Sequence, residues 1–375
     1  MRILQLGKFY PPHIGGIETV MYDITDVLNN KGYSTDVLCS NRENSYLEEY
    51  INDYKVIRTK SYGVKFSTSI TPQMILKLRE IINNYDIIHV HLPDPMANLA
   101  LMFVNLKNKK IILHWHSDII KQKNLLKFYE PFQNWIMNKA DKIIATTPKY
   151  ITESKYLQKY KSKCISIPIG IDRDKLKINQ ELLKNLKNKY KNKRIIFSLG
   201  RLAYYKGFQY LIESAKYLDD DYIILIGGNG PLKKELENTI KINNLEDKVK
   251  LLGRIEDNEL GSYYKLCDLF CLPSIIKSEA FGVVQIEAMS FAKPIIATKI
   301  DGSGVDWVNK DKVSGINVDI KNSKALASAF EAILLNDDIY KKYSNNTLER
   351  FNQLFLRDKM VNEIMKLYKK TIKGN

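Results

Sequence analysis

The sequence predicts an α/β protein of two domains, each built around a parallel β-sheet. Short apolar runs that indicate strands alternate with helical patterns through nearly the whole chain, and this alternation is typical of βαβ units. At Arg194 the pattern begins again, because RIIFSLGRLAYYKG repeats the order of strand, glycine and basic loop found in RILQLGKFYPPHIGG from Arg2. A chain of 375 residues is also too long for one typical core and long enough for two.

The first domain is expected to span residues 1–170. Its strand-like runs are, in chain order, Arg2–Gly7, Ser34–Cys39, Tyr54–Thr59, Asp86–His91, Lys110–Trp115, Lys142–Thr147 and Lys163–Gly170. Helical patterns lie between several of these runs. The clearest example is Ile17–Gly32, where Gly32 can act as the C-cap.

The second domain is expected to span residues 171–355. It follows a joint at Ile167–Leu176, where proline, glycine and polar residues gather. Its strand-like runs are Arg194–Gly200, Tyr222–Gly228, Val249–Arg254, Leu269–Ser274 and Lys293–Thr298. A last helix, within residues 356–375, follows the completed second sheet, and the sequence leaves open whether it packs back on the first domain.

The composition indicates a cytoplasmic globular protein. Hydrophobic residues make up 45% and charged residues 27% of the chain, and no apolar run approaches the ~20 residues that cross a bilayer. The N-terminal apolar stretch breaks at Lys8, as expected of a buried first strand and not of a signal peptide. Four cysteines, of which Cys267 and Cys271 lie in an apolar segment without a nearby histidine, indicate reduced core thiols.

Three interpretations of the net charge of +16 are open. A nucleic-acid binder would cluster its cations with exposed aromatic residues. A peripheral membrane protein would place lysines beside apolar residues on one helix face, as the stretch Ile119–Lys139 does with Lys121, Lys123 and Lys127. A helix that packs on the core and carries lysines on its solvent-exposed face explains that stretch equally well. The lysines are mostly dispersed, as in Lys184–Arg194. This favours the third interpretation, that the charge reflects the overall composition and not a nucleic-acid or membrane partner.

Two glutamates, Glu279 and Glu287, stand in the otherwise apolar or small segment SEAFGVVQIEAM. On one helix they would lie about 12 Å apart, too far for the ~5–9.5 Å carboxylate pair of a glycosidase. They suit the two hydroxyl-rich ends of one extended ligand, while a helix start at Gly282 offers free N–H groups to an anion between them. An amphipathic helix with two surface glutamates is the alternative.

Glycines and basic residues follow several predicted strands, where open α/β sheets bind ligands. Arg201 and Lys206 follow one such strand, and two fixed cations there would neutralise a departing diphosphate. Gly15 and Gly16 follow the first strand and would let the backbone approach a ligand closely. Neither this segment nor Gly227–Leu232 has the dinucleotide fingerprint. Two such domains facing each other would form a cleft.

All five histidines lie in the first third of the chain, at the ends of predicted strands. Alternate residues of a strand face one side, so the HVH and HWHSD runs could pair on a metal. A third ligand of known position is lacking, and no metal site is expected. His116 is interpreted as a substrate-contacting residue, and His89 or His91 as core residues. The D-x-D spacing at Asp172–Asp174 is explained by helix capping.

Together these motifs resemble the retaining glycosyltransferases of family 4. The resemblance rests on Gly15-Gly16, on the histidine of HSD at His116, on G-R-L-x-x-x-K-G at Gly200–Gly207 and on E-A-F-G-x-x-x-x-E at Glu279–Glu287. It covers nearly the whole chain and implies the GT-B fold, in which two Rossmann-like domains face each other across a cleft. The first domain would bind the acceptor and the second the nucleotide sugar, without a metal ion or other cofactor.

The resemblance also implies roles for individual residues. The donor site would consist of Gly15, Gly16, Arg201, Lys206, Glu279, Ala280, Phe281, Gly282, Val283 and Glu287. Glu287 would bind the ribose and Glu279 the transferred hexose, while the two cations would hold the diphosphate and the glycine pair would lie near it from the opposite domain. His116 would contact the hexose near the reacting centre. The catalytic set would thus be His116, Arg201, Lys206 and Glu279.

The expected reaction is the retaining transfer of a hexose, mannose favoured, from a nucleotide sugar to a growing, lipid-linked cell-surface glycan. GDP-mannose is the favoured donor, and a UDP-sugar such as UDP-glucose or a UDP-N-acetylhexosamine is the alternative. The acceptor hydroxyl would attack from the front face, and the departing phosphate oxygen would take its proton. A GT-B sugar-nucleotide epimerase and a basic nucleic-acid-binding protein are further alternatives. No nucleic-acid partner is expected, and contact with the anionic inner membrane stays open.

Overall fold

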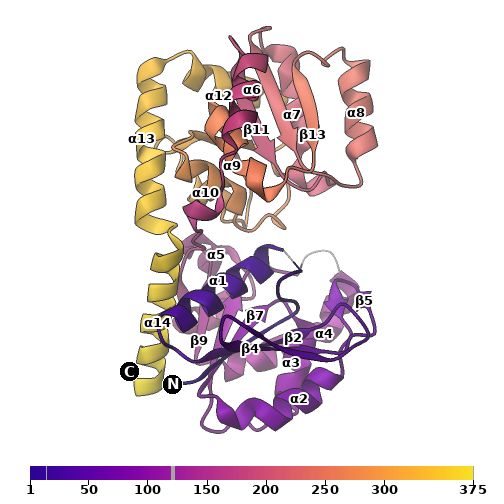
Figure 1. The fold of residues 1–375 in the computed structure, drawn as a ribbon, viewed down its shortest axis with the longest axis vertical. Coiled ribbons are helices and arrows are strands. Elements are labelled where there is room, and N and C mark those ends of the chain that lie inside the picture. The colour runs from indigo at the N-terminus through magenta and orange to yellow at the C-terminus, as the bar shows by residue number, and fades with distance from the viewer. Residues whose placement is uncertain (14, 120–122, 375) are drawn as a thin grey trace. The chain divides into compact units, whose positions relative to one another are not determined.

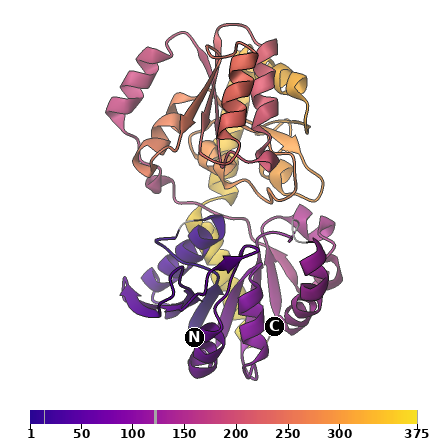
Figure 2. The same ribbon diagram turned by 90° about the vertical axis from the view of Figure 1, so that its right-hand side faces the viewer.

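The computed structural model describes residues 1–13, 15–119 and 123–374, without the side chains of residues 123–128. The chain forms two compact units, of which one contains Met1–Ile169 and Arg357–Asn375 and the other Gly170–Leu356 (Figures 1 and 2). The chain therefore leaves the first unit once and returns to it for its last helix. Across the described residues, no helix is both long and apolar enough to cross a membrane.

The first unit is built around an eight-stranded sheet in the order β10-β9-β8-β7-β1-β2-β4-β3. The strands are β1 (Ile3–Gly7), β2 (Thr35–Ser40), β3 (Leu47–Ile51), β4 (Tyr54–Thr59), β7 (Ile87–Leu92), β8 (Lys110–Trp115), β9 (Lys142–Ala145) and β10 (Cys164–Ser166). All neighbours in this sheet run parallel except β3, which pairs antiparallel with β4. A separate antiparallel ribbon consists of β5 (Val64–Lys65) and β6 (Thr68–Ser69).

The edge strand β3 departs from the parallel sheet that the sequence predicts. Asn52 and Asp53 both have positive φ, 46° and 72°, and form the two-residue turn that leads into β4. Glu49 of β3 lies 2.6 Å from Arg58 of β4. Charged, half-exposed side chains are usual on an edge strand. They give it no apolar pattern, which is why the strand was missed.

The described residues of the first unit form six α-helices. They are α1 (Gly16–Asn30), α2 (Gln73–Ile81), α3 (Pro95–Met102), α4 (Lys123–Lys139), α5 (Pro148–Glu153) and α14 (Arg357–Lys373), and the 3-10 helices are η1 (Ile82–Asn84) and η2 (Gln158–Lys163). The last helix, α14, packs against α1. A guanidinium nitrogen of Arg357 lies 3.9 Å from a carboxylate oxygen of Asp23 and 3.9 Å from one of Asp26, both on α1. Its buried residues recur with a helical period, so one face of α14 covers this unit.

The second unit has a six-stranded parallel sheet in the order β13-β12-β11-β14-β15-β16. The strands are β11 (Arg194–Leu199), β12 (Tyr222–Gly227), β13 (Val249–Gly253), β14 (Leu269–Leu272), β15 (Ile295–Lys299) and β16 (Gly315–Asp319). The sequence predicted all of these except β16. A buried cluster that includes Leu211, Ile224 and Phe330 joins the strands to the covering helices.

The helices of the second unit lie around this sheet (Figure 2). They are α6 (Gln180–Lys189), α7 (Phe208–Ser214), α8 (Lys233–Ile242), α9 (Asp257–Leu266), α10 (Val283–Ser290), α11 (Val305–Val308), α12 (Ser323–Leu334) and α13 (Asp337–Leu354), with the 3-10 helices η3 (Arg173–Lys175), η4 (Tyr204–Lys206) and η5 (Ala215–Tyr217). Asp172 caps η3 by accepting the N–H of Asp174 at 3.0 Å, as capping predicts. Cys267 and Cys271 are buried free thiols, as expected.

Candidate active site

The second sheet has a switch point that brings two loops together. Strand β11 lies between β12 and β14, so the chain order reverses there and the loops after β11 and β14 leave the sheet side by side. The first loop contains η4 (Tyr204–Lys206), and the second spans residues 273–282. The N–H of Ile275 in the second loop donates to the carbonyl oxygen of Tyr205 in the first at 2.8 Å.

An ion pair also joins the two loops. The Nζ atom of Lys206 lies 2.6 Å from Oε2 of Glu279, and the two side chains are only 9% and 12% exposed. The hydroxyl of Ser274 donates a further hydrogen bond to the same carboxylate oxygen at 3.2 Å. A Cβ atom at Gly200 would come within 3.1 Å of Cε of Lys206. Glycine at position 200 therefore leaves room for the lysine side chain.

Lys206 keeps its charge inside the protein. Burial by itself lowers the pKa of Lys206, but the carboxylates of Glu279 and Glu287 and the phenol of Tyr205 raise it by more, so that the pKa lies above its ordinary value. An ammonium group has three N–H donors, and Glu279 occupies one of them. Lys206 can therefore bind an anionic group while it remains paired.

Glu279 stands in the loop before α10 and not on one helix with Glu287, whereas the helix start expected at Gly282 agrees with the structure. Helix α10 begins only at Val283, after Gly282, whose φ of +76° ends the loop. The separation of about 12 Å between the glutamates assumed one continuous helix and therefore does not apply. Both Glu279 and Glu287 act electrostatically on Lys206, so the loop returns Glu279 toward the lysine.

Glu287 lies inside α10 and accepts a hydrogen bond from the hydroxyl of Tyr264 at 2.6 Å. Burial raises the pKa of Glu287, while this hydrogen bond and the charge of Lys206 lower it, and the net shift is upward. Tyr264 is held by edge and tilted ring contacts with Phe197 and Phe270, at 5.4 and 5.8 Å between centroids. Among the described residues the other carboxylate oxygen has no hydrogen-bond partner, so it can accept from a ligand hydroxyl.

The segment Ala280–Val283 turns the chain into α10. The N–H of Gln285 donates to the carbonyl oxygen of Gly282 at 2.9 Å. In the part of the chain that the structure describes, the N–H groups of Val283 and Val284 have no acceptor. These groups lie at the positive end of the helix dipole and are suited to bind an anion.

Arg201 is exposed in the loop after β11. Its guanidinium forms no ion pair with any residue of the described ranges. Tyr205 has a raised pKa because it is buried, and the nearby charges of Lys206 and Arg201 oppose this shift. Both cations therefore lie near the same phenol. An arginine without a protein partner at the carboxyl end of a central strand is available to phosphate oxygens.

Gly15 and Gly16 lie in the first unit, at the start of α1. Gly15 is the N-cap, and a Cβ atom there would overlap the carboxylate of Glu18. The position of a Cβ atom at Gly16 is open, so packing alone does not require glycine there. The expected contact of this pair with a diphosphate stays a prediction.

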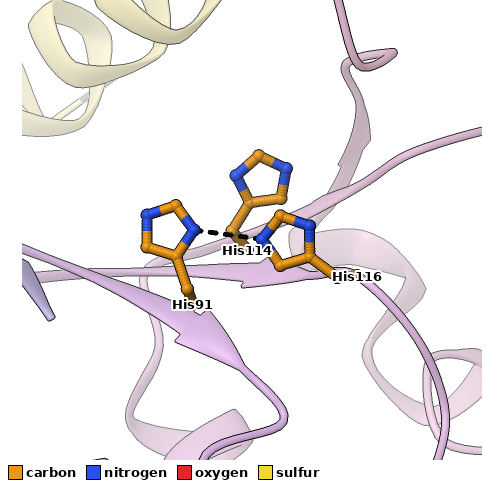
Figure 3. Close-up of side chains that lie close together, drawn as sticks. All are labelled: His91, His114 and His116. Atoms are coloured by element: carbon orange, nitrogen blue, oxygen red, sulfur yellow. Dashed lines mark hydrogen bonds between the residues drawn. The ribbon is translucent and has the colours of Figure 1, made fainter. Parts of the chain in front are cut away.

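His116 follows β8 in the first unit and is only 7% exposed. His89 and His91 face one side of β7, and His114 and His116 face the same side from the next strand, because β7 and β8 are in parallel register with His91 opposite His114. A hydrogen bond of 3.0 Å joins Nδ1 of His91 to Nε2 of His116. Figure 3 shows this bond as a dashed line, with His114 beside the two rings. Burial lowers the pKa of His116 well below its ordinary value, so this imidazole is neutral at pH 7.

His91, His114 and His116 are the three described residues whose side chains could share a metal ion. Their candidate ligand atoms all lie within 4.8 Å of one another. The planes of His91 and His116 incline by only 13°, with ring centroids 5.3 Å apart. With their nitrogens 3.0 Å apart, the two rings meet edge to edge, as in an N–H···N hydrogen bond. The expectation that the chain holds no metal stays a prediction.

Comparison with known proteins gives the family. The family model described as Glycosyltransferase Family 4 matches residues 14–175, and the model described as Glycosyl transferases group 1 matches residues 179–350. The chain is 30% identical over 369 residues to the O-antigen chain mannosyltransferase C of Escherichia coli, which is 98% of each protein. The chain belongs to glycosyltransferase family 4. This glycosyltransferase is also 28% identical to the D-rhamnosyltransferase WbpZ of Pseudomonas aeruginosa, over 95% of this chain and 92% of that protein.

Solved structures show that the glycosyltransferase has the GT-B fold. The sucrose-phosphate synthase of Thermosynechococcus elongatus matches it with a TM-score of 0.79 at 20% identity, over 100% of both chains. Anabaena HepE in complex with UDP matches with a TM-score of 0.79 at 19% identity, over 99% of this chain and 100% of that one. The protein is thus a hexosyl-transferring enzyme, and its family decides against the epimerase and the non-catalytic nucleic-acid binder.

Sequence reasoning missed residues that position the glutamates of this glycosyltransferase. Tyr264 donates to Glu287, and the hydroxyl of Ser303 donates to the backbone carbonyl of Glu279. The N–H of Gly304 donates to the carbonyl oxygen of Ala280 at 2.8 Å. The small residues Ser303 and Gly304, which follow β15, were the available sequence signal for the contacts with Glu279 and Ala280. Nothing in the sequence links Tyr264 to α10.

Proposed function

We propose that this glycosyltransferase transfers a hexose, with mannose favoured, from GDP-mannose to a growing, lipid-linked cell-surface glycan with retention of configuration. The buried pair of Lys206 and Glu279 carries the proposal, because it places a cation and a hydroxyl-binding carboxylate 2.6 Å apart at the switch point of the sheet. Similarity to an O-antigen chain mannosyltransferase favours mannose and a bacterial glycan acceptor.

In this proposal the donor lies across the loops after β11 and β14. Glu287 accepts hydrogen bonds from the ribose through the carboxylate oxygen that Tyr264 leaves open. Arg201, Lys206 and the N–H groups at the start of α10 bind the diphosphate. Glu279 accepts hydrogen bonds from the hexose hydroxyls while its other interactions hold it in place.

The proposed chemistry is a front-face displacement at the anomeric carbon of the hexose. The acceptor hydroxyl oxygen forms the new bond to this carbon, the bond from the carbon to the phosphate oxygen breaks, and the departing oxygen takes the hydroxyl proton. Lys206 and Arg201 stabilise the negative charge that develops on the diphosphate. With two cations on the leaving group, we expect no requirement for a metal ion or another cofactor.

Thermal shift of the full chain with GDP, UDP and ADP, in the presence of a chelator, tests the donor site. GDP at 100 times its Kd should add about 2.7 kcal/mol to the free energy of unfolding. A shift with UDP alone would move the donor to UDP-glucose or a UDP-N-acetylhexosamine. Release of GDP from GDP-mannose with a lipid-linked acceptor then tests transfer.

Two lysine variants, one a test and one its matched control, examine the thermal shift that the nucleotide causes. Lys206→Met should lose most of the nucleotide-induced shift, because the diphosphate loses a buried cation. Lys248→Met removes a lysine that pairs with the almost fully exposed Asp220 in the same unit, and it should keep the shift. No shift of the unmodified protein with any nucleotide would refute the donor site.

We also propose that the enzyme contacts the anionic inner membrane from the cytoplasmic side. The stretch expected to do so is only partly described: Lys121 lies outside the described residues, and the side chains of Lys123 and Lys127 lie outside them too. A second basic and apolar surface supports the proposal at the β5–β6 ribbon. There Tyr62 is 63% and Val64 is 51% exposed beside several lysines.

Co-sedimentation with vesicles tests this contact. The protein should pellet with phosphatidylglycerol vesicles at low salt and not with phosphatidylcholine vesicles. The double variant Tyr62→Ser/Val64→Ser should pellet less, whereas Ile242→Ser, which removes a 79% exposed apolar side chain from the second unit, should behave as the unmodified protein. Binding to random DNA without binding to vesicles would refute the membrane contact.

A further inference from the structure

A chain of hydrogen bonds leads from His116 through the first sheet to the last helix. Nε2 of His116 lies 3.0 Å from Nδ1 of His91, and Nε2 of His91 lies 2.9 Å from Oε1 of Gln5 on β1. Nε2 of Gln5 donates to the hydroxyl oxygen of Tyr368 on α14 at 3.3 Å, and this hydroxyl also contacts Nδ1 of His89. The members of the chain are buried.

The orientation of the Gln5 amide decides the direction of donation along this chain. Its oxygen can only accept, so His91 must donate from Nε2. Burial lowers the pKa of His91 and of His116 well below the ordinary value, and a neutral imidazole has a single N–H. Nδ1 of His91 therefore accepts, and His116 donates from Nε2. Tyr368, which accepts from Gln5, can donate its own proton to His89.

We propose that Gln5, His91 and Tyr368 are positioning residues that hold His116 in the Nε2–H tautomer, so that its bare Nδ1 accepts a hydrogen bond from a hydroxyl group of a bound sugar. Among the described residues, the hydrogen bond of His116 is made by Nε2 and none is made by Nδ1. Both ring nitrogens of the neighbouring His114 are buried without a hydrogen-bond partner. The inference rests on the proposed function only in that the hydroxyl belongs to a sugar substrate. The other tautomer would turn an N–H toward the hydroxyl oxygen and would break the bond to His91.

A metal ion shared by His91, His114 and His116 is the rival interpretation. Zinc would need bare nitrogens at ~2.0–2.1 Å that converge on one point. The facing nitrogens of His91 and His116 instead point at each other across 3.0 Å. The ring of His114 stacks on that of His116, with planes inclined by 14° and centroids 4.2 Å apart. A nitrogen lone pair lies in the plane of its ring, so the lone pairs of His114 are nearly parallel to the plane of His116 and do not point at the hydrogen bond between His91 and His116.

Long-range ¹H–¹⁵N correlation spectra of the full chain labelled with ¹⁵N-histidine test the proposal. They show which nitrogen of each imidazole carries the proton, and the chain has only five histidines, so a His116→Asn spectrum identifies the resonances of His116. We expect a proton on Nε2 and a bare Nδ1 at pH 7 without any donor. A proton on Nδ1 would overturn the proposal.

This spectrum needs no sugar, so the two proposals fail separately. An Nε2–H tautomer together with an inactive transferase would refute the proposed function and leave the chain of hydrogen bonds intact. One equivalent of Zn²⁺ should leave the ¹⁵N resonances of His91 and His116 unchanged. Loss of the N–H of His116 on addition of Zn²⁺ would replace the hydrogen-bond chain by a metal site.

Variants of Gln5 separate positioning from a merely structural role. Gln5→Met keeps the volume and removes the amide, so His116 should show both tautomers and kcat should fall about tenfold, as for one lost hydrogen bond to substrate. Gln5→Glu keeps an accepting oxygen and should restore the single tautomer. Gln133→Met replaces a buried glutamine of α4 in the same unit and is the matched control. A single Nε2–H tautomer in Gln5→Met would refute the positioning role.

Discussion

The ammonium group of Lys206 lies 2.6 Å from the carboxylate of Glu279, at the point where the loops after β11 and β14 meet. Both side chains are nearly buried, and the attraction between them keeps the lysine charged where burial alone would favour the neutral form. Two opposite charges so placed stabilise each other. Either of them without its partner would be a buried, unpaired charge.

Lys206→Met should therefore affect activity and stability together. Loss of one charge that stabilises the leaving group should lower kcat/KM roughly 100-fold or more. The unpaired carboxylate of Glu279 should lower the free energy of unfolding by about 3–5 kcal/mol. Steady-state kinetics and urea unfolding measure the two effects.

The double variant Lys206→Met/Glu279→Gln separates these effects. It removes both charges, so stability should return toward that of the unmodified protein while activity stays low. Lys233→Met removes the exposed ion pair with Glu237 of the same unit and should change stability by about 1 kcal/mol or less. Turnover at the unmodified rate in Lys206→Met would remove this lysine from the leaving-group site.

Arg201→Ala should lower kcat without lowering the thermal midpoint. The side chain is exposed and has no ion-pair partner in the described ranges, so its removal leaves no buried charge behind. Its loss from the diphosphate should cost roughly 100-fold in kcat. Arg254→Ala, which removes another exposed arginine after a strand of the same sheet, is the control and should leave kcat unchanged. Equal kinetics for the two variants would contradict the role of Arg201.

Tyr264→Phe should shift the acidic limb of the pH profile of kcat/KM to higher pH. Burial raises the pKa of Glu287, and the hydrogen bond from Tyr264 opposes this shift, as does the charge of Lys206, while Asp257 adds to it. Removal of the hydroxyl therefore raises the pKa of Glu287 further, and the carboxylate that accepts from the ribose forms only at higher pH.

The raised pKa of Glu287 also makes the stability of the protein depend on pH. A carboxyl group whose pKa is raised by folding stabilises the protein below its unfolded pKa, and this contribution is lost as pH rises through the folded value. In Tyr264→Phe the loss should extend to higher pH, which urea unfolding across the acidic range measures. Tyr263→Phe, on the same helix, is the control. Identical pH profiles for the two variants would mean that Tyr264 does not tune Glu287.

Gly207→Ala should destabilise the protein more than Gly253→Ala does. The two glycines have similar φ, 68° and 73°, and an L-residue there costs about 1–2 kcal/mol. Only at Gly207 would the new Cβ atom also overlap the carbonyl oxygen of Pro273, whereas the space at Gly253 is open. The difference in thermal midpoint between the variants therefore measures the close approach of the two loops. Equal midpoints would show that the loops can separate without cost.

The strands of both sheets could largely be predicted from the sequence because their apolar runs are local. The edge strand β3 and the late strand β16 could not, since β3 presents charged side chains to solvent and β16 carries glycine, asparagine and aspartate among few apolar residues. The turn at Asn52-Asp53 was a readable signal for the β3–β4 hairpin. Apolar periodicity alone does not detect such strands.

Some features of the candidate site could likewise be predicted from the sequence, and others could not. Arg201, Lys206, Glu279 and Glu287 were found because they stand near glycines after strands, which is a local pattern. The estimate of about 12 Å placed Glu279 on one helix with Glu287, although Gly282 was also expected to start the helix. The structure agrees with the second expectation, since Gly282 has a φ of +76° and α10 begins at Val283. His114 and His91 likewise became neighbours only through the register of β7 and β8.

By itself the sequence determined the alternation of strands and helices, the restart at Arg194 and the chemistry that follows each strand, since these depend on residues close together in the chain. The tertiary structure decided which of these groups meet. Lys206 reaches Glu279, Tyr264 reaches Glu287, and Gln5 of the first strand reaches Tyr368 of the last helix, because the order of strands in each sheet and the return of α14 bring distant segments into contact. Such contacts depend on burial and packing over the whole unit, which no short stretch of sequence contains.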